Sequence, residues 1–192
     1  MNHLATSNRD RDRRVRERQD ALIATNVRWL RQALTLLGRL NDAVYASMPQ
    51  GLAPHRAGSH LRHILEFYEC FLEGVDSAHI DYDARRRDEA VERCRAVALA
   101  RIESIIQLLE GMPSLRCDNV LWVRMEDADP GQVRDSFLMS SVSRELQTLS
   151  SHTIHHFALI AVTLLAHGVA VDPDFGVAPS TLRHRAKKAE AA

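Results

Sequence analysis

Residues 142–167 read VSRELQTLSSHTIHHFALIAVTLLAH, which is the most apolar long segment of the chain. Gly168 follows it, and glycine is a preferred residue just beyond the end of a helix. The three- and four-residue spacing of one helix face joins Leu149, His152, His156, Ile160 and Thr163. The segment therefore predicts a long core helix whose inward face carries two histidines.

His152 and His156 are one helical turn apart, which brings their Cβ atoms to roughly 5–6 Å from each other. Two imidazoles at that spacing can hold one metal ion at about 2.0–2.1 Å from each nitrogen. His155 points about 100° away from His156, because each residue advances an α-helix by that angle, so it cannot easily share the ion. Burying two imidazoles without partners is unfavourable, and a metal ion would satisfy both.

Three earlier segments also show helical spacing of apolar residues, at about residues 21–46, 59–75 and 88–110. Proline and glycine separate the first two segments in MPQGLAP, residues 48–54. Residues 115–139 alternate in part and contain ADPG, which predicts a short irregular or hairpin-like excursion between the third and fourth helices. The expected fold class is all-α, as a four-helix bundle.

The second helix offers a third ligand, because His60 and His63 lie beside its apolar face. Bundles build metal sites from facing helices. Two other metal motifs do not fit. Thr153 stands where H-E-x-x-H needs glutamate, and neither Glu66 nor Glu145 has a histidine three residues later, as a ferritin-like di-iron site requires. The alternative is a plain helical scaffold in which the histidines are structural and bind no metal.

The composition indicates a globular domain, with 192 residues, 45% hydrophobic and 26% charged. Its 25 Lys and Arg balance 25 Asp and Glu, so we expect neither nucleic acid nor a membrane as a partner. The apolar run at residues 157–166 is also too short to span a bilayer. Cys70, Cys94 and Cys117 are widely spaced and odd in number, which predicts free thiols and a cytoplasmic protein.

The expected organisation has three parts. Residues 1–19 are a polar N-terminal extension, residues 20–170 a metal-binding bundle, and residues 171–192 a C-terminal tail. A homodimer is a further expectation, because the first helix has apolar residues to spare.

The second helix reads H60-L-R-H63-I-L-E, and the last helix carries H152-T-I-H155-H156. In order and spacing this pattern resembles the DinB-like superfamily over roughly residues 20–170. The segments DYDARRRDEA and DFGVAPSTLRHR are similar to loops in one branch of it. The resemblance implies a four-helix bundle with a three-histidine metal site. It also implies that His63, His152 and His156 are the ligands, with His60 and His155 as additional histidines.

The resemblance implies fold and metal more strongly than activity, since several members act with low-molecular-weight thiols, as thiol S-transferases do, and many have no assigned activity. Three histidines leave a coordination position open for a thiol or another small molecule, whose pKa the ion would lower. All-imidazole ligation suits Zn, Ni or Fe(II) and does not distinguish them. We therefore expect a thiol-dependent transferase acting on small molecules, or a non-enzymatic metal-binding, interaction or stress-response protein.

Five further residues are candidates for the same site. His60, Glu66 and His155 could orient a ligand, or the glutamate could act as a base. Arg85 and Arg87 could bind the carboxylates of a thiol, because the guanidinium fork matches carboxylate geometry. Alternatively, these arginines are solvent-facing charges paired with nearby aspartates.

Overall fold

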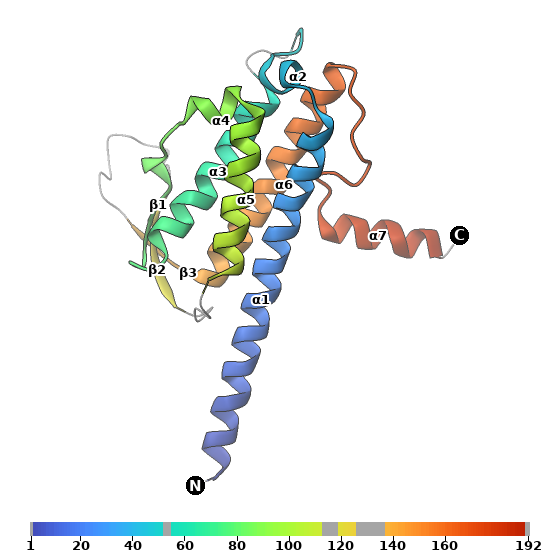
Figure 1. The fold of residues 1–192 in the computed structure, drawn as a ribbon. Coiled ribbons are helices and arrows are strands. Elements are labelled where there is room, and N and C mark those ends of the chain that lie inside the picture. The colour runs from blue at the N-terminus through green and yellow to red at the C-terminus, as the bar shows by residue number, and fades with distance from the viewer. Residues whose placement is uncertain (1, 52–54, 113–118, 126–136, 191–192) are drawn as a thin grey trace.

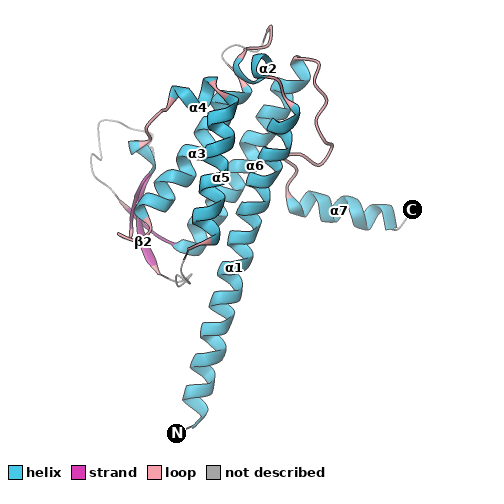
Figure 2. Cartoon of the chain, viewed as in Figure 1, coloured by secondary structure: helices cyan, strands magenta, loops and turns pink. Residues whose placement is uncertain are grey.

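The computed structural model describes residues 2–51, 55–112, 119–125 and 137–190. Within these ranges the protein is mostly helical, with a small sheet on one side (Figures 1 and 2). The helices are α1 (Asn2–Arg39), α2 (Asp42–Ala46), α3 (Ala57–Gly74), α4 (Glu89–Arg93), α5 (Arg95–Glu110), α6 (Val142–Ala166) and α7 (Pro179–Glu190). The strands are β1 (His79–Asp81), β2 (Val120–Arg124) and β3 (Leu138–Ser141), and a 3₁₀ turn, η1, spans Tyr82–Ala84.

The longest helices, α1, α3, α5 and α6, share one core (Figure 1). Helix α3 packs against α5 and α6, and α1 packs against the same two helices. Each helix therefore turns one apolar face inward, as the sequence pattern predicts. Fully buried core side chains include Leu30, Ile64, Phe71, Ile102, Leu149 and Phe157. The contact between α3 and α6 is the one that positions the candidate site.

Two of the predicted helices are interrupted. The segment at 21–46 divides after Arg39, because the Asn41 side chain accepts a hydrogen bond from the Val44 N–H at 2.8 Å and starts α2. The segment at 88–110 divides at Cys94, which adopts extended backbone angles. Next to this break the Val91 carbonyl accepts a hydrogen bond from the Tyr45 hydroxyl at 2.6 Å, which ties α4 to α2.

The two ends of the chain are helical. Residues 2–19, the expected polar N-terminal extension, are the first half of the continuous helix α1, and the N-terminal end of this helix projects from the body (Figure 1). In the expected tail, Phe175 is buried and stacks on Phe157 of α6, with ring centroids 4.5 Å apart. Helix α7 follows, has no buried residue, and projects away from the core.

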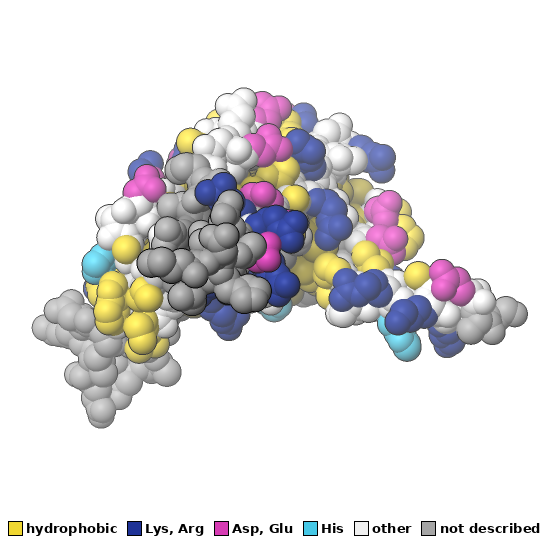
Figure 3. All heavy atoms as spheres, turned by 90° about the horizontal axis from the view of Figure 1, so that it is seen from below, with side chains coloured by type: hydrophobic (Ala, Val, Ile, Leu, Met, Phe, Trp, Pro, Cys, Tyr) yellow, Lys and Arg dark blue, Asp and Glu magenta, His cyan; other side chains and the backbone are white. Residues whose placement is uncertain are grey.

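The excursion before α6 contributes β2 and β3 to a three-stranded sheet with the order β1-β2-β3 (Figure 1). Strands β2 and β3 pair antiparallel, as a hairpin-like segment predicts, although residues 126–136 between them lie outside the described ranges. Strand β1 pairs parallel with β2 and was not expected, because three residues carry no recognisable alternation. Apolar side chains gather on the sheet side of the molecule (Figure 3), and Trp122, Leu138 and Met139 are exposed.

Helix α6 is long and apolar enough, by length and composition alone, to cross a membrane. The core helix of a water-soluble protein passes the same test, and α6 packs against α1 and α3. The expectation that a membrane is not a partner therefore stays a prediction.

Candidate metal centre

Three of the predicted site residues meet where α3 packs against α6. His63 comes from α3, and His152 and His156 come from α6. One nitrogen from each ring lies within 4.8 Å of the others, and all three side chains are half-buried. This cluster of three imidazoles could hold one metal ion.

The distances suit a shared ion. The Nε2 atoms of His63 and His152 are 3.1 Å apart. Two nitrogens bound tetrahedrally at about 2.0–2.1 Å from a metal ion would be separated by roughly 3.3 Å, so a small adjustment would suffice. The ring centroid of His156 lies 4.6 Å from that of His63 and 4.5 Å from that of His152.

The electrostatic setting keeps the two rings on α6, those of His152 and His156, neutral. Burial, followed by the neighbouring His63, lowers the pKa of His152 to about 4. Burial, followed by His152 and His63, lowers the pKa of His156 to about 3. Neutral imidazole is the form that binds a metal ion, so at pH 7 these donors need not lose a proton first.

A buried hydrogen-bonded cluster behind the histidines fixes α3 against α6 and α1. The Tyr68 hydroxyl donates to Asn26 Oδ1 at 2.8 Å and lies 3.2 Å from Thr153 Oγ1. The Asn26 amide also donates to the Leu146 carbonyl of α6 at 3.0 Å. Because Thr153 is the residue after His152, this cluster fixes the backbone beside His152 as well as the packing of three helices.

Aromatic rings form one wall of the site. Phe67 lies one turn after His63 and stacks on His152, with ring centroids 4.0 Å apart. Tyr82 of η1 also stacks on Phe67, with ring centroids 4.8 Å apart, and its hydroxyl donates to the buried Glu145 carboxylate at 2.9 Å. This wall is apolar and closely packed, which restricts the rotation of the His152 ring.

Arg85 reaches this wall, whereas Arg87 does not. The Arg85 guanidinium lies over the Phe67 ring, 4.9 Å from its centroid, and it is among the charges that lower the His152 pKa. Arg87 is exposed and has a positive φ of 52°. Thus one of the two arginines proposed as anion ligands lies beside the histidines. Two of the aspartates near these arginines form ion pairs elsewhere: Asp81 pairs with Arg124, and Asp88 pairs with Arg101.

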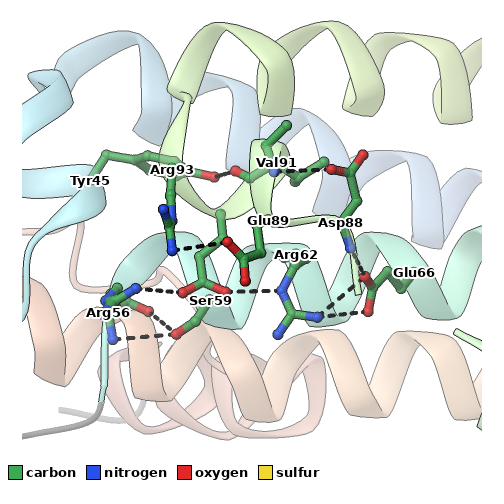
Figure 4. A network of polar contacts seen from close by, with 11 residues as sticks. Tyr45, Arg56, Ser59, Arg62, Glu66, Asp88, Glu89, Val91 and Arg93 are labelled. Carbon is green, nitrogen blue, oxygen red and sulfur yellow. Dashed lines mark hydrogen bonds and ion pairs between the residues drawn. The ribbon is translucent and has the colours of Figure 1, made fainter. Parts of the chain in front are cut away.

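The remaining candidates lie in different surroundings. His60 is buried, and its Nδ1 is 3.1 Å from Nδ1 of His156. His155 is exposed beside His156, with ring centroids 5.1 Å apart. Glu66 is buried away from solvent and accepts hydrogen bonds from the Arg62 guanidinium and the Asp88 N–H at 2.8 Å (Figure 4). These partners engage Glu66 in an ion-pair network that links α3 to α4.

Several residues at the site were not predicted from the sequence. Phe67 could have been found, because it lies four residues after His63 on one helix face. Tyr82 and His55 lie outside the long helices, so no periodicity marks them. Burial, followed by Glu73, raises the pKa of the Cys70 thiol to about 11. Cys94 is exposed, and Cys117 lies outside the described residues.

Comparison with known proteins gives one partial match. No protein-family model matches the chain, and no solved structure matches it. FK506-binding protein 5 of Rhizopus delemar is 35% identical over 111 residues, which is 57% of this chain and 28% of that protein. The chain thus spans less than a third of that relative, and the match does not assign a family. The resemblance to DinB-like proteins stays a prediction.

Proposed function

We propose that this chain is a divalent-metal-binding protein with a DinB-like four-helix bundle, in which His63, His152 and His156 hold one ion. The observation that carries the proposal is the convergence of three imidazoles from two helices, two of which, those of His152 and His156, have a lowered pKa. The pairing of α1 and α3 with the same two neighbours, α5 and α6, supports the bundle. Zn, Ni and Fe(II) all suit this set of nitrogen donors.

We further propose that the site serves thiol chemistry on a small molecule. An ion held by three side chains has room for another ligand and, when bound, lowers the pKa of a coordinated thiol. The chain's own residues would contribute orientation: Phe67 packs the His152 ring in place, and Arg85 supplies positive charge beside it. That charge favours a thiol that also carries a carboxylate.

The partial match does not carry FK506 binding to this chain, because it covers so little of the FK506-binding relative. A purely metal-binding role, without thiol chemistry, is the second candidate function. It is favoured by Glu66, the acid/base candidate predicted from the sequence, whose carboxylate is engaged by Arg62 and Asp88. Binding of a thiol to the loaded site separates the two.

The first experiment measures metal content in protein purified without a histidine tag. We expect about one divalent ion per chain by mass spectrometry, and we expect His63→Ala and His152→Ala to weaken binding by more than the roughly 10–100-fold that loss of an outer hydrogen-bond partner costs. His184→Ala is the control, because His184 is exposed and lies on α7, which has no buried residue. Equal metal binding by His152→Ala and the wild type would contradict the site.

The thiol proposal is tested on the same protein loaded with Co²⁺. Addition of cysteine should produce a thiolate-to-metal charge-transfer band, and Arg85→Gln should weaken this binding more than it weakens binding of uncharged 2-mercaptoethanol. If the Co²⁺-loaded protein gives no such band with any small thiol, the proposal of a thiol-dependent transferase is refuted, whereas the proposed metal site is not.

A further inference from the structure

The imidazole of His156 has two nitrogens, and the structure assigns them different partners. Its Nδ1 lies 3.1 Å from Nδ1 of His60, within hydrogen-bond distance. Nε2 is therefore the nitrogen left for the ion shared with His63 and His152. On its other edge, His60 Nε2 lies 3.2 Å from Nδ1 of His55. His55, His60 and His156 thus form a chain that runs from the surface to the site.

We propose that His60, supported by His55, is a positioning residue that fixes the tautomer and orientation of the ligand His156. This inference rests on the proposed metal site. A metal-bound histidine commonly donates its second N–H to an acceptor, which holds the ring and makes it a better ligand. Here the acceptor is another imidazole instead of the usual carboxylate or carbonyl.

The ligand role of His156 determines where each proton lies. If Nε2 of His156 faces the ion, its Nδ1 carries the proton and donates to Nδ1 of His60. His60 then carries its own proton on Nε2 and donates it to Nδ1 of His55. The last N–H, on His55, can be solvated because that residue is exposed. Every hydrogen bond in the chain therefore points outward, with one arrangement of protons.

The packing supports a fixed chain. His60 is 9% exposed, so its ring cannot exchange this partner freely for water. The rings of His55 and His60 are nearly parallel, with an interplanar angle of 10° and centroids 5.2 Å apart. His60 also precedes His63 by one turn on α3, so one helix provides both a ligand and the support for a ligand on α6. Displacement of the His60 ring would release His156.

The test compares substitutions that keep or remove the acceptor at the δ position. Asparagine places its Oδ1 close to where histidine has Nδ1, whereas leucine fills the space without an acceptor. We expect His60→Leu to weaken Zn²⁺ binding by about 10–100-fold, as measured by competition with a chelating dye, and His60→Asn to recover most of that loss. His55→Ala should have a smaller effect, and His184→Ala, at an exposed position of α7, none.

A second measurement needs no metal. Nitrogen NMR of the metal-free wild type should show His156 protonated on Nδ1, and His60→Leu should shift it towards the Nε2-protonated tautomer. The inference is overturned if His60→Leu binds Zn²⁺ as tightly as the wild type, if His60→Asn is as weak as His60→Leu, or if wild-type His156 carries its proton on Nε2. Failure of the wild type to bind any metal would instead refute the proposed function. The NMR measurement of the His156 tautomer would still test the hydrogen bonds that link His55, His60 and His156.

Discussion

Tyr68 shows how single side chains hold the candidate site. It is fully buried, and its hydroxyl reaches Asn26 on α1 and Thr153 on α6. Burial raises its pKa far above the ordinary value, so the group stays a neutral phenol and can donate a hydrogen bond at any physiological pH. Removal of this hydroxyl would leave buried polar atoms on two other helices without one of their partners.

We therefore expect Tyr68→Phe to lower the free energy of unfolding by about 1–3 kcal/mol, because a buried polar group that loses its partner is destabilising by that amount. Urea denaturation of the metal-free protein measures the change. Thr35→Ala is a suitable control, since Thr35 is exposed and bonds only to its own helix, so its effect should stay within about 0.5 kcal/mol. An unchanged midpoint for Tyr68→Phe would show that the cluster does not stabilise the fold.

At the scale of elements, the close approach of α3 to α4 depends on a glycine. A Cβ atom placed on Gly58 would lie 2.0 Å from the carbonyl oxygen of Glu92 and 3.1 Å from the Tyr45 ring. Gly58 stands two residues before His60, so this close contact also fixes the position of α3 along its axis and hence where its histidines lie relative to α6. The helix break at Cys94 lies beside this contact.

Gly58→Ala should lower the free energy of unfolding by about 1–3 kcal/mol, the usual effect of overpacking, and should weaken metal binding because the start of α3 must move. Gly38→Ala is the matched control. It is also in a helix but has open space around its Cβ position, so up to about 1 kcal/mol of stabilisation is expected from helix propensity. Equal behaviour of the two variants in urea titrations would rule out a steric role for Gly58.

For the whole molecule, the histidine cluster couples folding to pH. The pKa of His60 and of His152 is lowered to about 4, and that of His156 to about 3, chiefly by burial. In the unfolded chain these groups titrate near 6.5. Between these values the unfolded chain binds more protons than the folded protein, so acidification favours unfolding.

We expect the free energy of unfolding of the metal-free protein to fall as the pH is lowered from 7.5 to 5, as measured by urea denaturation at several pH values. A variant with His152→Gln and His156→Gln should show a shallower dependence, whereas His79→Gln, at an exposed position, should follow the wild type. Identical slopes for the double variant and the wild type would contradict the lowered pKa values. Added Zn²⁺ should steepen the wild-type slope, because protons compete with the ion.

Local sequence was enough to predict most of the helical content and the pairing of His152 with His156 on one helix face, whereas the choice of His63 over His60 came from the family resemblance. The reason is that helix formation and the i, i+4 geometry of His152 and His156 follow from spacing along one segment. The hairpin-like character of the segment before α6 was also visible, in the pairing of β2 with β3. Strand β1 was not, because a three-residue strand exists only through its partner β2.

By itself, then, the sequence determined which faces are apolar and which imidazoles share a helix face. Tertiary packing was needed to bring Nε2 of His63 to 3.1 Å from Nε2 of His152. The same holds for the engagement of Glu66 by Arg62 and Asp88 and for the contact of His55 with His60. These outcomes depend on how α3 packs against α6 and α4. That packing is set by Tyr68, Asn26 and Gly58, through contacts between residues far apart in the chain, which no local periodicity encodes.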